Sequence, residues 1–118
     1  MIKTISHISI SDSGVDGTRY VSGNEQFVLG HYPHLAIFPG VLSLQLINSL
    51  IQKYCDKMNI RFCIGQIVKV QYLGIICPGD KLLVRVWKVK EQETSITFRG
   101  EIISNAETKV KAIIINRL

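Results

Sequence analysis

The sequence predicts an α+β domain in which one long helix is wrapped by an antiparallel sheet. Between residues 41 and 58 apolar side chains recur every three or four positions, which is the period of a helix. After residue 59 four segments alternate apolar and polar residues, and two shorter segments of this kind precede the helix. At 118 residues, with no linker or internal repeat, residues 1–118 are expected to form a single domain.

The helix is expected over residues 40–58. Pro39-Gly40 is a start signal, and the periodic residues end just before Asn59. Because apolar residues take up most of the circumference, we expect the helix to be buried. They are Leu44, Ile47, Leu50, Ile51, Tyr54, Cys55 and Met58.

The strands differ in how clearly the sequence marks them. Residues 2–11 give an imperfect strand pattern. The polar residues 11–18, which include two glycines, are expected to form a turn or loop. Residues 19–22 are expected to form a short strand. Residues 23–39, with two glycines and two prolines, are the candidate functional loop. After the helix, strands are expected over 62–72, 82–89, 96–102 and 110–114, with a turn at 77–80. A sheet with free edges favours a dimer.

The net charge of +5 comes from the second half of the chain. Residues 1–60 carry four basic and four acidic side chains, whereas residues 61–118 carry ten and five. The excess fits either a solvated outer face of the strands or a docking surface for an acidic partner. Nucleic acid is disfavoured, because no aromatic pair lies among the dispersed basic residues. The chain has no apolar run of about eighteen residues or more, so no membrane span is expected.

The chain has three cysteines, which are Cys55, Cys63 and Cys77. Their number is odd, and their spacing is not that of metal ligands. They are expected to be reduced, buried thiols. Together with the lack of a signal-peptide pattern at the N-terminus, this favours a cytoplasmic protein. His34 lies three residues after His31, but no further ligand is near in sequence, so we expect no metal site.

A candidate site consists of His31 in the turn-rich loop, Gly40 nine residues later and Gln45 fourteen residues later. A loop histidine supplies a base near neutral pH. A backbone amide at a helix N-terminus binds an oxyanion. Gln45 donates a hydrogen bond but delivers no proton.

These residues resemble the hotdog-fold 3-hydroxyacyl-(acyl-carrier-protein) dehydratases. Gly30-His31-Tyr32-Pro33 followed by Pro39-Gly40-Val41-Leu42 is similar to that family's histidine loop and helix start. Asn24-Glu25 and Phe27 match the segment before it, and Cys77-Pro78-Gly79-Asp80-Lys81-Leu82 is similar to its Pro-Gly-Asp turn. The resemblance covers about residues 19–115. It implies a hotdog fold, a dimer with active sites at the interface, and acyl chains carried on the phosphopantetheine of an acyl carrier protein, with no other cofactor.

The resemblance also implies roles for single residues. His31 is the expected base and the Gly40 amide the expected holder of the thioester oxygen, while Gln45 stands where the family has a catalytic Glu or Asp. The expected substrate contacts are Phe38, Pro39, Val41, Leu42 and Tyr72. Leu73-Gly74 replaces the family's basic pair in the third strand, where the carrier protein approaches.

Several functions remain open. The chain is expected to dehydrate 3-hydroxyacyl thioesters in fatty-acid- or polyketide-type biosynthesis, with His31 acting as base and then as acid. Alternatively, it is one subunit of a hotdog heterodimer whose partner supplies the missing carboxylate, or a non-catalytic acyl-thioester-binding scaffold. A thioesterase is disfavoured, because enzymes of that kind use a carboxylate to activate water. A homodimer, a heterodimer and a higher oligomer all remain compatible with the sequence.

Overall fold

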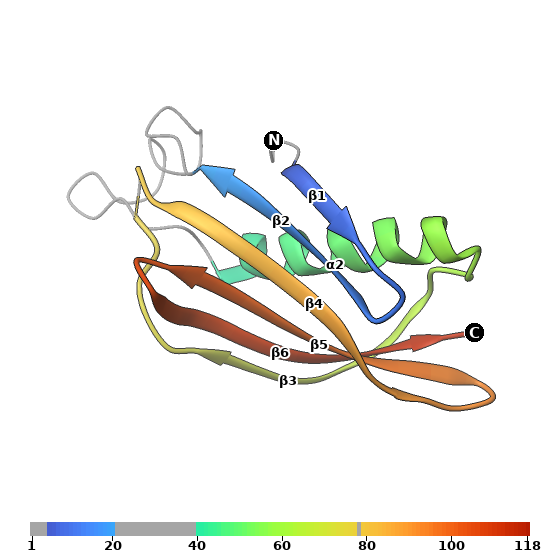
Figure 1. Cartoon of the computed structure of the whole chain (residues 1–118). Helices are drawn as coiled ribbons and strands as arrows, with labels where there is room; N and C mark the ends of the chain where they lie inside the picture. The colour runs from blue at the N-terminus through green and yellow to red at the C-terminus, as the bar shows by residue number, and fades with distance from the viewer. Residues whose placement is uncertain (1–4, 21–39, 78) are drawn as a thin grey trace.

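The structure is a computed structural model that describes residues 5–20, 40–77 and 79–118. Within them it has one helix and six strands (Figure 1). They are β1 (Ser6–Ile10), β2 (Gly14–Tyr20), α2 (Gly40–Met58), β3 (Ile64–Tyr72), β4 (Lys81–Glu91), β5 (Ser95–Ser104) and β6 (Glu107–Arg117). The predicted order of two strands, one helix and four strands is therefore confirmed.

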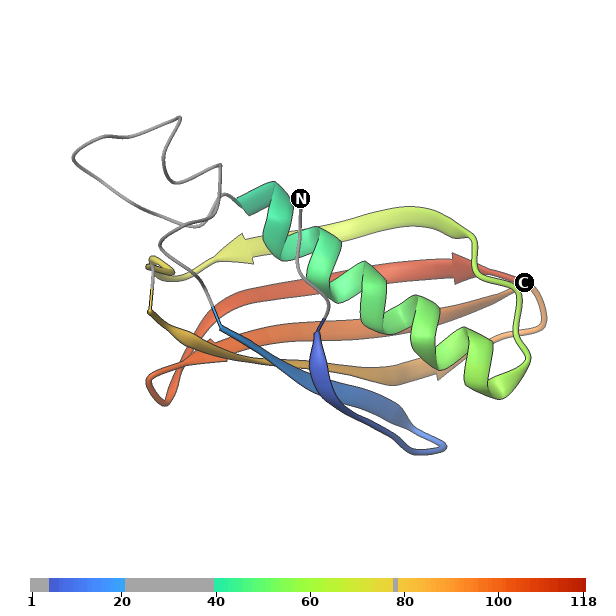
Figure 2. The ribbon, with the colours of Figure 1, turned by 90° about the horizontal axis from the view of Figure 1, so that it is seen from above.

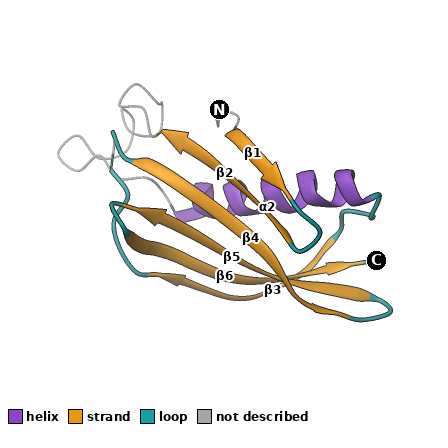
Figure 3. Cartoon of the chain, in the orientation of Figure 1, coloured by secondary structure: helices purple, strands orange, loops and turns teal. Residues whose placement is uncertain are grey.

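All six strands belong to one antiparallel sheet in the order β1-β2-β4-β5-β6-β3, so β1 and β3 are its edges. The helix crosses one face of this curved sheet (Figures 2 and 3). The closest contacts of α2 are with β2, β4 and β5. The core lies between these elements, and the helix-facing side of the β3 edge is left less covered.

The helix begins and ends where the sequence predicts. At its C-terminal end Asn59 takes a left-handed conformation with φ of 57°. The N–H of Ile60 then donates to the carbonyl oxygen of Cys55 at 2.8 Å, the bond typical of a Schellman motif. This geometry turns the chain sharply toward β3.

The prediction of a helix buried all round is wrong. One face is buried, through residues such as Leu46, Ile47 and Leu50. The opposite face is exposed, and its polar residues follow the helical period: Gln45, Ser49, Gln52, Lys53, Asp56 and Lys57. The sheet covers a single side of the helix, so the polar residues between the apolar ones remain in solvent.

The prediction of a loop over residues 11–18 is also wrong, because β2 begins at Gly14. This strand pairs with β4 along its whole length, from Gly14 opposite Trp87 to Tyr20 opposite Lys81. Its glycines allow close packing: a Cβ atom at Gly17 would lie 2.5 Å from a methyl group of Ile5. Gly17 therefore allows close packing of a strand, although a glycine in a polar segment of the sequence is typical of a turn.

The helix packs closest to the sheet at Gly100 on β5. A Cβ atom at this position would lie 2.6 Å from the Cγ2 atom of Ile47, whose side chain is fully buried. About two helical turns further on, Tyr54 packs edge-on against Phe98, with ring centroids 5.5 Å apart. Together these contacts fix the distance between α2 and the middle of the sheet.

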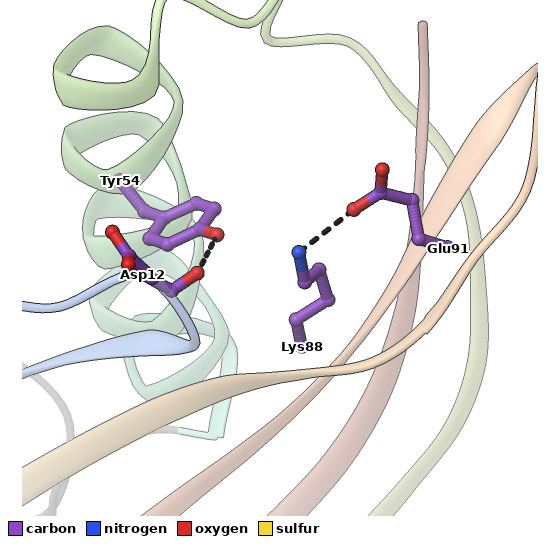
Figure 4. Close-up of polar contacts among 4 residues, drawn as sticks. All are labelled: Asp12, Tyr54, Lys88 and Glu91. Atoms are coloured by element: carbon purple, nitrogen blue, oxygen red, sulfur yellow. Dashed lines mark hydrogen bonds and ion pairs between the residues drawn. The ribbon is translucent and has the colours of Figure 1, made fainter.

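Polar contacts join the helix to the ends of the strands. The Tyr54 hydroxyl donates to the backbone carbonyl oxygen of Asp12 at 2.5 Å, in the turn between β1 and β2 (Figure 4). Near it, the half-buried Lys88 makes an ion pair of 2.7 Å with Glu91, and its hydrogen bond to this carboxylate raises the pKa of the Lys88 ammonium (Figure 4). The buried Asn116 accepts from the N–H of Cys63 and donates to the carbonyl oxygen of Arg61. It thereby ties the segment after α2 to β6.

The three cysteines are free, and Cys55 is fully buried in the face of α2 that packs on the sheet. Burial, with a smaller effect of the neighbouring Asp56, raises the pKa of its thiol from 9.0 to about 11. The prediction that all three are buried is wrong: Cys63 is half-buried and Cys77 is exposed, because they lie in the segments before and after the edge strand β3 and not in the core.

In the described part of the chain, no helix is long and apolar enough to cross a lipid bilayer. The turn predicted at 77–80 is present in its described residues: a carboxylate oxygen of Asp80 accepts from the N–H of Cys77 at 2.9 Å.

Replacing Gly100 with alanine tests the closest approach of helix and sheet. We expect Gly100→Ala to lower the free energy of unfolding by about 1–3 kcal/mol, because the new methyl group displaces the packed side chain of Ile47. Gly65→Ala, on the edge strand β3, is the matched control, since the atoms nearest to its Cβ belong to the flexible side chain of Arg117. Urea denaturation measures both; an equal effect of the two substitutions would contradict this packing.

The buried Cys55 thiol gives a pH dependence that can be measured. Between pH 9 and about 11 the thiol of the unfolded chain loses its proton while the folded chain keeps it, so stability falls as the pH rises. We expect the free energy of unfolding to fall more steeply over this range in the wild type than in Cys55→Ala. Equal slopes would show that burial does not perturb this thiol.

Candidate functional site

The start of α2 provides backbone donors that have no partner within the helix. Gly40 is its first residue, and the first N–H groups of a helix have no partner within it. Three predicted site residues, His31, Phe38 and Pro39, lie outside the described residues. Of the others at the helix start, Val41 is the second residue of α2, and Leu42 is half-buried and packs against the core. The N-terminus of α2 is therefore where the sequence predicts an oxyanion-binding amide.

Gln45 lies one turn further along and lines a groove of about 740 Å³. Its side chain is exposed, and its backbone carbonyl oxygen accepts a bond of 2.8 Å from the Ser49 hydroxyl. The groove follows the polar face of the helix. The polar residues that line it are Gln45, Asn48, Ser49, Gln52 and Lys53.

Apolar side chains complete the groove. Ile5 and Ile8 contribute from β1 and its start, while Phe62 and Ile64 contribute from the segment that leads into β3. None of the described residues that line the groove is Asp or Glu. Within α2 the one acidic residue is Asp56, near the C-terminal end and eleven positions from Gln45. A proton donor for this site has to come from outside the described surroundings of Gln45.

Asn48 is a site residue that the sequence prediction missed. It is half-buried, and its Oδ1 atom is shielded from solvent without a hydrogen-bond partner. Such an acceptor is costly unless a ligand or water donates to it. The signal for it was available, since polar residues at positions 45, 48, 49 and 52 of an otherwise apolar helix fall on one face.

Tyr72 ends β3, and its side chain is 54% exposed, so it does not belong to the core of this chain. It belongs to a run of exposed apolar side chains along and just beyond this edge strand. The run consists of Ile67, Val68, Tyr72, Leu73 and Ile75. A substrate contact by Tyr72 stays a prediction.

Exposed basic side chains lie on the sheet face that points away from α2. Arg85 and Arg99 alternate with buried core residues of β4 and β5, which places them on this outer face. Elsewhere among the described residues, Lys88 makes an ion pair with Glu91, and Lys109 makes one with Glu107. A solvated outer face accounts for the charge, and docking of an acidic partner stays a prediction.

The fold is shared by a solved structure. The dehydratase heterocomplex ApeI:P from Xenorhabdus doucetiae superposes with a TM-score of 0.76 at 19% identity, covering 99% of this chain and 100% of that one. At this identity the likeness concerns the fold alone, and it confirms the predicted hotdog fold.

Curated relatives carry the comparison further. The 3-hydroxyacyl-(acyl-carrier-protein) dehydratase FabZ of Buchnera aphidicola is 31% identical over 99 residues, covering 78% of this chain and 64% of that protein. FabZ of Clostridium acetobutylicum is 30% identical over 103 residues, covering 81% and 71%. The chain thus spans a little less than two thirds of the Buchnera relative.

A family model gives the broadest match. The model of the ApeI-like family, described as ApeI dehydratase, matches residues 7–112, which include both sheet edges, the helix and the predicted loop. This range is most of the chain and extends beyond the histidine loop that the resemblance rests on. The chain belongs to the ApeI-like dehydratase family.

Proposed function

We propose that this chain acts in the dehydration of 3-hydroxyacyl thioesters carried on an acyl carrier protein. The observation that carries the proposal is the position of Gln45, which lines a groove one turn from a helix start at Gly40. Membership of a dehydratase family and the FabZ relatives support the reaction type. Fatty-acid- or polyketide-type biosynthesis in the cytoplasm is part of the same proposal.

This chain provides groups for proton removal, for stabilisation of the thioester oxygen and for orientation of the leaving hydroxyl. His31 removes a proton from the carbon next to the thioester carbonyl, and the amide of Gly40 stabilises the enolate-like oxygen. The carbon–oxygen bond at the next carbon then breaks, and the leaving hydroxyl takes a proton to depart as water. Gln45 orients this hydroxyl by a hydrogen bond. Phe38, Pro39, Val41, Leu42 and Tyr72 contact the substrate, and metal or organic cofactors play no part.

The source of the second proton separates two versions of this function. In the first, His31 returns the proton it removed. In the second, a different hotdog subunit supplies a carboxylate to a composite site, which the absence of Asp and Glu from the described groove lining favours. Loss of a general acid typically lowers the rate by about 10²–10⁴. A single chain acting alone is then a slow enzyme.

A partner subunit has a place to bind at β3. This edge strand exposes Ile67, Val68 and Tyr72 to 43–54%, and exposed apolar edges favour pairing with another strand. The opposite edge strand, β1, has only five residues and an irregular register, which makes it the poorer partner. We therefore place the interface with a second hotdog subunit, the same or different, at β3.

Substitution of Gln45 distinguishes the two versions. Gln45→Glu restores a proton donor, so we expect it to preserve or raise the rate at which the isolated chain dehydrates a 3-hydroxyacyl carrier-protein substrate. His31→Ala should abolish the reaction in every assembly, because the base is lost. Loss of water is followed by mass spectrometry. Gln92→Glu, in the turn between β4 and β5, is the control for added charge and should leave the rate unchanged.

Three results of this experiment would be decisive. Wild-type turnover by the isolated chain favours His31 as both base and acid. Turnover only after addition of a second hotdog subunit favours the composite site. No turnover by the wild type, by Gln45→Glu or by a mixed assembly would contradict a dehydratase and leave a non-catalytic acyl-thioester scaffold.

Lysines on the edge strand test the interface. We expect the wild-type chain to sediment as a dimer and the double variant Val68→Lys, Leu73→Lys to sediment as a monomer, because charges on a sheet edge prevent pairing. Val89→Lys is the matched control, since Val89 on β4 is 57% exposed and lies away from this edge. A double variant that remains dimeric would place the interface elsewhere.

A further inference from the structure

We infer that the outer face of the sheet, which points away from α2, binds the same face of a second copy of this chain. The contact is separate from the proposed function and from the proposed interface at β3, because it joins copies through a sheet face rather than a sheet edge. The observation that carries the inference is a row of charged side chains whose order is complementary to its own reverse.

The row crosses the four neighbouring strands β2, β4, β5 and β6. Asp16 on β2 lies opposite Arg85 on β4. Glu101 on β5 lies opposite Arg85 on one side and opposite Lys111 of β6 on the other. All four residues alternate along their strands with buried ones, which places their side chains on the outer face. Across the sheet the row is therefore acidic, basic, acidic and basic.

A two-fold axis reverses the order of the row in a second copy. When the axis runs parallel to the strands, between β4 and β5, Arg85 faces Glu101 of the second copy. Asp16 then faces Lys111 of the second copy, and the symmetry makes each of these pairs occur twice. An axis along the row would instead place every residue opposite itself, and like charges that face each other repel. The order of the charges therefore favours the axis parallel to the strands.

The rows on either side of the charged one match under the same axis. Leu83 on β4 lies opposite Ile103 on β5, so the axis places Leu83, which is 36% exposed, on Ile103 of the second copy. On the other side Trp87 lies opposite Arg99, so the axis places the Trp87 ring against the guanidinium group of Arg99 of the second copy. Three consecutive rows therefore pair an apolar group with an apolar one, opposite charges, and a cation with an aromatic ring.

The shape of the sheet determines how strong this contact is. The sheet curves around α2, so its outer face is convex (Figure 2). Two convex faces touch mainly along the central strands β4 and β5, which carry three of the matched pairs. The long side chain of Lys111 spans the wider distance to Asp16 of the second copy. Because the contact is small, we expect weak association, with pairing through β3 alone at low protein concentration.

An acidic partner is the other candidate occupant of the outer face. Such a partner fits Arg85, Arg99 and Lys111, but it brings its own carboxylates against Asp16 and Glu101 in the same row. A second copy presents both signs of charge in the matching order. The alternation therefore favours the second copy.

Two single charge reversals test the pairing. Arg85→Glu leaves two carboxylates at the centre of the row, and Glu101→Arg leaves two guanidinium groups there, so each variant repels its own copies at this face. We expect each reversal alone to weaken association about tenfold, because an attractive pair becomes repulsive at two symmetric places. In an equimolar mixture of the two variants opposite charges face each other again, so association should return to that of the wild type.

Sedimentation velocity measures the association as the protein concentration is raised from about 10 µM to about 1 mM. In the background of Val68→Lys, Leu73→Lys the contact at β3 is removed, so the remaining association reports the outer face. The chain has one tryptophan, Trp87, whose fluorescence should shift to shorter wavelength as a second copy displaces water from its ring. About 1 M salt should weaken the association, because it screens charges that are more than ~3 Å apart.

Matched controls carry the same charge changes elsewhere. Arg117→Glu at the end of β6 and Glu93→Arg in the turn between β4 and β5 lie outside the three rows, so they should leave association unchanged. Circular dichroism verifies that each variant is folded. Arg85→Glu should also leave the rate of dehydration by the active assembly unchanged, because the row lies across the sheet from α2. Failure of this inference is therefore distinguishable from failure of the proposed function.

Several outcomes would overturn the inference. These are a mass that does not rise with concentration in the Val68→Lys, Leu73→Lys background, a reversed variant that associates as tightly as the wild type, or a mixture that does not regain association. An acidic carrier protein whose binding is weakened by Arg85→Glu and strengthened by Glu101→Arg, while the chain itself does not associate through this face, would assign the outer face to an acidic partner instead.

Discussion

The close packing of Ile47 on Gly100 determines where the rest of the structure lies. Because β5 has no side chain at this point, α2 approaches the sheet until the fully buried Ile47 lies over the strand. The edge-on contact of Tyr54 with Phe98 sets the same separation further along the helix. With the helix axis fixed, its N-terminus and its polar face are fixed too, so the core and the candidate site depend on the same contacts.

A helix packed on one side has a free side, and this chain uses the free side for polar groups. Gln45, Ser49 and Gln52 follow the helical period and line a groove with Asn48 and Lys53. Such a surface differs from a hydrocarbon tunnel, since it offers donors and acceptors at regular intervals along the helix. In the proposed function, its proximity to the first amides of α2, which have no partner within the helix, links binding to the chemistry of thioesters.

The sequence predicts those elements whose residue pattern is compatible with only one type of secondary structure. The bounds of α2 follow from Pro39-Gly40, the apolar period and Asn59, and the four strands after it follow from alternation. The glycine-containing first part of β2 was missed, because Gly17 has the pattern of a turn residue and only the structure shows Ile5 packed against it. The exposed face of α2 was missed for a related reason: the count of apolar residues does not reveal how far the sheet wraps. The unpaired Oδ1 atom of Asn48 depends on packing that no local pattern encodes.

A crystal structure of the assembled protein with a 3-hydroxyacyl amide of phosphopantetheine, an unreactive analogue of the thioester, tests the central claim most directly. The account predicts that the analogue's carbonyl oxygen lies about 3 Å from the amide nitrogen of Gly40, with His31 beside the adjacent carbon. An analogue bound away from the start of α2, or with its carbonyl oxygen out of reach of Gly40, would contradict the account.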